Sequence, residues 1–152
     1  TMLGEAQWQW LEAQLKQPAD LRLIVSSVQV IVEGHGWEGW HNFPLEQTRL
    51  RQLIKRTHAK GVVFLSGDRH IGAIYKHAEP EGYPLYEVTS SDMTHAWSSA
   101  KEQGPNRLGE LITQNHFALI EIDWPQQQIQ LGFQNTQGEW LKKQSIGLSE
   151  LR

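Results

Sequence analysis

The sequence predicts an α/β fold: a mixed sheet with flanking helices on one side, followed by C-terminal antiparallel hairpins. Three observations predict it. The N-terminal part alternates helical and strand patterns, and the C-terminal part contains strand patterns alone. The length, 152 residues with 39% hydrophobic residues, is that of one ordinary globular domain. We therefore expect a single core.

Two segments have the pattern of amphipathic helices. The first covers residues 4–16 and is followed by Pro18, which stops a helix. The second begins at Pro44, because proline is well tolerated in a first helical turn, and ends before Gly61. The apolar positions at helical spacing are Trp8, Leu11 and Leu15 in the first helix and Leu45, Leu50, Leu53 and Ile54 in the second.

The remaining elements read as strands. Residues 21–32 are rich in Val and Ile and predict a buried strand that runs into a loop. Residues 62–66 (VVFLS) are the kind of short apolar run found in the middle of a sheet that is covered on both faces. Further strands are expected over residues 71–76 and 85–90, and over 117–124, 127–134 and 139–146, where turns join them as antiparallel hairpins.

Composition excludes several classes of protein. Fourteen Lys and Arg against 17 Asp and Glu give a net charge of -3, so no nucleic-acid partner is expected. No apolar run approaches the roughly 18–20 residues of a membrane helix, so no membrane span is expected. The absence of cysteine excludes thiolate zinc sites, thiol catalysis and disulfides.

The most informative motif is Gly-Asp-Arg-His at residues 67–70. A buried strand that ends at Gly67 delivers the next side chains to the carboxyl edge of the sheet, where α/β folds place ligands. In extended backbone, Asp68 and His70 would share a face, so that a carboxylate and an imidazole converge as ligands for a metal ion. The alternative is an ordinary turn.

A second cluster lies in a glycine-broken loop over residues 35–41. Its aromatic and acidic residues would line a pocket: Trp37, Glu38 and Trp40. His35 or His41 would protonate a leaving group in that pocket. His35 is the preferred catalytic candidate. The alternative is an ordered loop whose two tryptophans pack on the edge of the sheet.

Six segments in order resemble the alkaline phosphatase D (PhoD-like) family of the calcineurin-like metallophosphoesterases. The likeness covers roughly residues 3–97, and the tail from His116 is similar only in being rich in strands. The segments are residues 3–11 (LGEAQWQWL), 21–30 (LRLIVSSVQV), 36–40 (GWEGW), 43–44 (FP), 63–70 (VFLSGDRH) and 85–91 (LYEVTSS).

The resemblance implies hydrolysis of phosphoric esters by hydroxide activated between two metal ions. It implies that Asp68 holds one metal and His70 the other. It also places Gln29 near a further ligand position, the alternative being a polar residue that leaves a strand. The metals are divalent or trivalent, and Ca, Fe, Zn, Mn and Mg are all compatible with this donor set. Trp37, Arg69 and His95 are the candidates for binding the substrate.

The family's other metal ligands come from an N-terminal half that has no counterpart in this sequence. Residues 1–152 therefore look like the C-terminal part of a PhoD-like domain, with its motifs in residues 3–97 and a strand-rich tail over 116–147. Two or three donors are too few for a catalytic dication, so we expect the chain to be inactive alone. The expected partners are a phosphate ester and either the missing N-terminal half or a second copy held through an exposed sheet edge. The resemblance also implies an extracytoplasmic parent protein.

A different class of function is also compatible with the composition. Seven tryptophans in a chain with alternating strands are a high count, and they are compatible with a non-catalytic carbohydrate-binding module.

Overall fold

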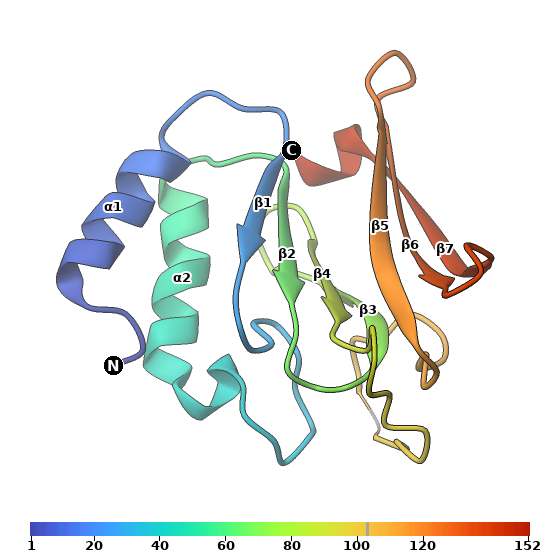
Figure 1. The fold of residues 1–152 in the computed structure, drawn as a ribbon. Helices are drawn as coiled ribbons and strands as arrows, with labels where there is room; N and C mark the ends of the chain where they lie inside the picture. Colours follow the sequence, from blue (N-terminus) through green and yellow to red (C-terminus); the bar gives the residue numbers. More distant parts are fainter. Residues whose placement is uncertain (103) are drawn as a thin grey trace.

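The computed structural model describes residues 1–102 and 104–152, which form three layers (Figure 1). Helices α1 (Glu5–Leu15) and α2 (Pro44–Arg56) lie on one face of a four-stranded mixed sheet. A three-stranded antiparallel sheet lies on the other face. The α/β fold predicted from the sequence, with helices on one side and hairpins at the C-terminus, is confirmed.

The mixed sheet sets the position of the site. Its strands are β1 (Arg22–Val25), β2 (Val62–Ser66), β3 (Gly72–His77) and β4 (Leu85–Ser90), in the order β1-β2-β4-β3. β1, β2 and β4 run parallel, whereas β3 is antiparallel to β4. Because the three parallel strands point the same way, their carboxyl ends meet at one edge of the sheet.

The C-terminal part forms the second sheet. It contains β5 (His116–Asp123), β6 (Gln128–Asn135) and β7 (Trp140–Gly147), all antiparallel to their neighbours. Two short 3₁₀ helices complete the fold, η1 (Trp40–Asn42) before α2 and η2 (Leu148–Leu151) after β7. None of the helices in the described residues is long and apolar enough to cross a membrane.

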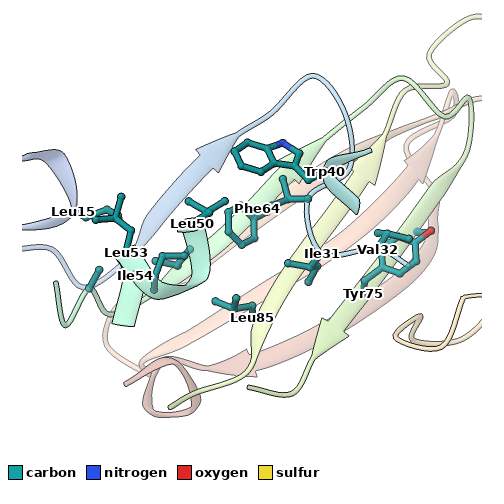
Figure 2. Close-up of a cluster of buried hydrophobic side chains, with 14 of the residues drawn as sticks. Leu15, Ile31, Val32, Trp40, Leu50, Leu53, Ile54, Phe64, Tyr75 and Leu85 are labelled. Atoms are coloured by element: carbon teal, nitrogen blue, oxygen red, sulfur yellow. The ribbon is translucent and has the colours of Figure 1, made fainter. Parts of the chain in front are cut away.

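Strand β2 lies between two hydrophobic cores, so the single core expected from the sequence is wrong. Val62 and Phe64 belong to the core under the helices, and Val63 belongs to the core between the two sheets. This alternation is expected of a strand whose successive side chains point to opposite faces. Figure 2 shows the helix-side core, which includes Leu15, Ile31, Val32, Trp40, Leu50, Leu53, Ile54, Phe64, Tyr75 and Leu85.

Of the buried strand expected to run into a loop over residues 21–32, only Arg22–Val25 is a strand, and its side chains are half-buried or exposed rather than buried. The apolar end of this segment, Val30–Val32, is buried in the helix-side core, but as a loop. The main-chain N–H groups of Val30 and Ile31 donate to the buried carboxylate of Glu87 on β4, at 2.7–3.1 Å. The Gln47 amide of α2 donates to the carbonyl of Val30 at 2.6 Å. Since these side chains satisfy the backbone, the loop needs no neighbouring strand.

Candidate functional site

Three loops meet at the carboxyl edge of the mixed sheet. They follow β1, β2 and β4, and they enclose an open cavity of about 440 Å³. Ligand sites of open α/β sheets are expected at this edge. The cavity is lined by Trp37, Glu38, Asp68, Arg69, His70, His95, Ala96, Trp97 and Ser98. Six of the residues named from the sequence therefore lie together: Trp37, Glu38, Asp68, Arg69, His70 and His95.

The turn after β2 carries the two proposed metal ligands. Asp68 and His70 both have positive φ, 72° and 52°, so the expectation of extended backbone at these positions is wrong. Both side chains are nevertheless exposed and both line the cavity. The Ser91 hydroxyl fixes the turn from the neighbouring strand end by accepting the main-chain N–H of His70 at 2.8 Å. A turn, rather than a strand face, brings the carboxylate and the imidazole together.

The imidazole of His70 has a defined tautomer. Its Nδ1 lies 2.9 Å from the carbonyl oxygen of His95, and a carbonyl only accepts, so Nδ1 carries the proton. Nε2 is then left with a lone pair on a side chain that is half exposed. The ring of His95 packs edge-on against it, with centroids 5.4 Å apart. His70 is thus oriented as a metal ligand or a proton acceptor.

A buried carboxylate, Asp92, lies behind His70 and was not found from the sequence. Its side chain is fully buried, and its oxygens lie 4.0 Å from His70 Nδ1 and 3.9 Å from His116 Nδ1. Burial raises the pKa of Asp92, and the nearby His116, His70 and His95 oppose that shift. Asp92 directly follows the Ser-Ser end of β4, which is the signal that might have found it.

Arg69 points into the protein. Its side chain is only 5% exposed and forms an ion pair with Glu102. The guanidinium lies 5.0 Å from the ring centroid of Trp37 and 5.9 Å from that of Trp97. A carboxylate therefore already partners the charge of Arg69. The expected role of Arg69 in substrate binding stays a prediction.

His35 and Gln29 do not line the cavity. His35 packs edge-on against His41, with centroids 4.8 Å apart, and its Nδ1 accepts the main-chain N–H of Trp37 at 3.2 Å. Burial lowers the pKa of His35, and the positive charge of Arg69 adds to the effect. Gln29 is fully buried and donates to the Thr89 hydroxyl at 2.9 Å. The catalytic role of His35 and the ligand role of Gln29 stay predictions.

The donors in the cavity suit a metal ion in kind but not in number. A carboxylate and an imidazole with a free Nε2 are ordinary ligands for the metals that the family resemblance implies. Within residues 1–102 and 104–152, however, no group of three or more His, Asp or Glu side chains is arranged to hold a metal ion. A catalytic zinc usually has three protein ligands. The described residues therefore do not form a complete metal centre.

The tryptophans do not form one exposed surface. Trp8 and Trp40 are buried, at 2% and 5% exposure, and their rings pack edge-on in the helix-side core. Trp10 and Trp124 are exposed on α1 and in the β5–β6 turn. In the part of the chain that the structure describes, these four tryptophans therefore give no continuous row of exposed rings of the kind expected for a carbohydrate-binding module.

Comparisons with known proteins agree with the sequence resemblance. The family model described as PhoD-like phosphatase matches residues 1–145. A solved structure of PhoD superposes with a TM-score of 0.74 at 17% sequence identity, and the match covers 99% of this chain and 34% of that chain. No curated protein matches the chain. The chain thus spans about a third of the solved PhoD structure, and it belongs to the PhoD-like phosphatase family.

Proposed function

We propose that this protein hydrolyses phosphoric esters and that the chain supplies part of a two-metal site through Asp68 and His70. One observation carries the proposal. In a chain of the PhoD-like phosphatase family, a carboxylate and an imidazole with a free Nε2 lie on one turn and line one cavity at the ligand-binding edge of the sheet. The substrate is a phosphate monoester or diester.

Each group has a defined task in this proposal. The Asp68 carboxylate and His70 Nε2 would each hold one cation, while the carbonyl of His95 keeps the imidazole in the tautomer that leaves Nε2 unprotonated. When bound, two such cations would offset charge on the phosphoryl oxygens and lower the pKa of an attacking water. The exposed ring of His95 borders the cavity, so it is placed to contact the substrate.

The remaining ligands would come from additional polypeptide. β1 is an edge strand of the mixed sheet, and its Leu23 and Val25 are 43% and 77% exposed. An uncovered apolar edge strand is a ready site for pairing with another segment. We infer that the segment supplying the further ligands packs along β1, as an N-terminal half or a second copy. The 152-residue chain alone is then inactive.

Substitution of the two ligands tests the proposal. Asp68→Asn and His70→Asn keep the turn, because asparagine tolerates positive φ, but weaken metal binding. In the complete protein we expect each to lower both bound metal, measured by mass spectrometry, and turnover of p-nitrophenyl phosphate and its bis ester by about 100-fold or more.

A matched control is available in His58, which is exposed, has the same φ of 52°, and lies near the opposite edge of the sheet. His58→Asn should leave metal content and turnover unchanged. Normal metal content and turnover in both Asp68→Asn and His70→Asn would remove the proposed site. Full turnover by the 152-residue chain alone with added metals would remove the proposal that its site is partial.

A further inference from the structure

Two tryptophans form an aromatic corner in the wall of the cavity. Trp37 comes from the loop after β1, and Trp97 from the loop after β4. Their ring centroids are 5.6 Å apart and their planes meet at 83°. Trp37 is 48% exposed and lines the cavity, so much of its side chain is accessible to a ligand. Asp68 and His70 line the same cavity.

The corner is held in place from behind. The buried guanidinium of Arg69 lies over both indole rings, and its charge is partnered by Glu102. Trp97 is fixed further: its main-chain N–H donates to the carbonyl of His70, and its Nε1 donates to Ser99 Oγ, both at 2.9 Å. Because these contacts exist before any ligand arrives, binding against the rings costs little conformational entropy.

The geometry suits a flat ring. A ring stacked on one indole would present its edge to the other, and both offset-stacked and edge-to-face pairs are favourable. The guanidinium behind the corner is buried and its charge is partnered by Glu102. The corner therefore contributes apolar, aromatic contacts, whereas the anionic phosphoryl group belongs with the ligands Asp68 and His70.

We propose that the corner of Trp37 and Trp97 binds a flat aromatic ring in the organic part of the phosphoric ester. The protein then prefers esters of ring-bearing alcohols to esters of small alkyl alcohols. This inference rests on the proposed function, because it takes the phosphoryl group to lie at Asp68 and His70. An aryl group and a nucleobase both offer such a ring.

Binding of non-hydrolysable phosphonates to the complete, metal-loaded protein tests the inference by calorimetry. Phenylphosphonate should bind about tenfold more tightly than methylphosphonate, a typical gain for one stacked ring. Trp37→Ala should weaken phenylphosphonate binding and bring this ratio to about one, whereas Trp37→Phe should keep most of the preference. Trp124→Ala removes a similarly exposed indole from the β5–β6 turn and should leave the ratio as it is.

The outcomes separate the two proposals. Equal binding of both phosphonates by the wild type, or an unchanged ratio in Trp37→Ala, overturns the aromatic corner and leaves the phosphatase site standing. If neither phosphonate binds the wild type, both the phosphoester site and the corner are overturned. If a methyl glycoside binds and neither phosphonate does, the cavity is a sugar site, and both the phosphoester site and the aromatic corner are overturned. If a nucleoside phosphonate binds more tightly than phenylphosphonate, the preferred ring is a nucleobase. If phenylphosphonate binds more tightly, the preferred substrate is an aryl ester. Either result supports the corner.

Discussion

The chemistry of the cavity depends on two residues in unusual backbone conformations. Asp68 and His70 have φ values of 72° and 52°, which carry a cost of order 1–3 kcal/mol for residues other than glycine. Aspartate and histidine are among the residues enriched at such angles. The hydrogen bond to Ser91 and the contact with the His95 carbonyl hold the turn in this form. The strain is therefore offset by contacts from the loop after β4.

His35 makes stability depend on pH. Burial lowers its pKa below the ordinary value of 6.5, Arg69 and His41 lower it further, and Glu102 opposes them. The unfolded chain therefore takes up a proton at a higher pH than the folded chain. The stabilising contribution is complete above about pH 6.5 and is lost as pH falls through the lowered pKa of the folded state.

We expect His35→Gln to flatten the acid side of the stability profile, because glutamine does not titrate and still offers an acceptor to the Trp37 amide. Urea unfolding between pH 7.5 and 5 measures the effect as the difference between the two proteins. His58→Gln changes an exposed histidine and should show the same dependence of the free energy of unfolding on pH as the wild type. An identical slope in His35→Gln and wild type would contradict the assignment.

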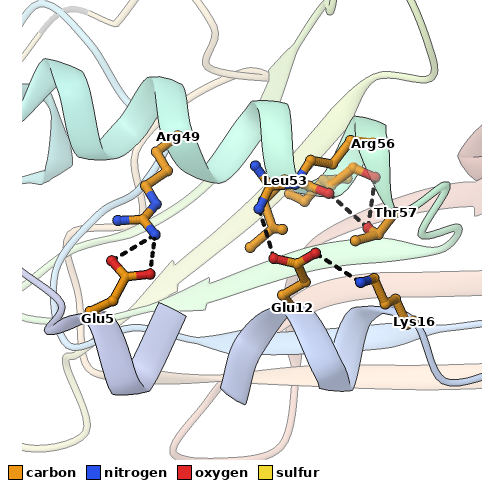
Figure 3. A network of polar contacts seen from close by, with 8 residues as sticks. Glu5, Glu12, Lys16, Arg49, Leu53, Arg56 and Thr57 are labelled. Carbon is orange, nitrogen blue, oxygen red and sulfur yellow. Dashed lines mark hydrogen bonds and ion pairs between the residues drawn. The ribbon is translucent and has the colours of Figure 1, made fainter. Parts of the chain in front are cut away.

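At the scale of elements, the two helices pack through a tryptophan and are bordered by charges. Trp8 of α1 is 2% exposed, and Arg49 of α2 lies 4.6 Å over its ring. Figure 3 shows the ion pairs at the rim, Glu5 with Arg49 and Glu12 with Arg56 and Lys16. These pairs are solvent-exposed and screened, so burial of Trp8 is the larger contribution.

Trp8→Ala should therefore lower the free energy of unfolding by about 3–5 kcal/mol, as the removal of a buried aromatic side chain does. Arg49→Met keeps the stem over the indole and removes the charge, and it should cost less than about 1 kcal/mol. Denaturant unfolding with a constant m-value compares them. Equal losses in the two variants would show that the charge, not the packing, joins the helices.

The spacing of apolar residues predicted these elements well where buried and exposed positions follow the period of a helix or a strand. Trp8, Leu15, Leu50 and Leu53 occupy the buried stripes of their helices, and β2 is covered on both faces as its sequence indicates. The error at Val30–Val32 has a physical cause. An apolar run favours a strand, but here Glu87, which lies 57 positions from Val30 in the sequence, takes up the backbone N–H groups.

At the scale of the whole molecule, the mixed sheet ends in an apolar edge. Leu23 and Val25 of β1 face the same side as Val63 and Leu65 of β2, with which they are in register. The second sheet packs against Val63 but leaves Val25 at 77% exposure. An uncovered edge of this kind promotes association.

The isolated chain should therefore associate more strongly as its concentration rises, and Val25→Lys should reduce this, because lysine on an edge strand opposes pairing. Sedimentation velocity gives the apparent mass of each variant. Leu45→Lys alters a leucine that is 85% exposed on α2 and should associate as the wild type does. Equal association of Val25→Lys and wild type would exclude β1 as the contact.

The sequence by itself determined the order of the helices and strands, the motif that carries Asp68 and His70, and the likeness to the PhoD-like family. These properties depend on residues close together in the sequence, and periodicity, turn residues and short motifs reveal them. Only the tertiary structure decided that Trp97, Glu102 and Asp92 surround the motif, that Arg69 is buried, and that His35 and Gln29 lie outside the cavity. The reason is that parallel strands bring distant loops to one edge, and contacts across such distances leave no pattern in the local sequence.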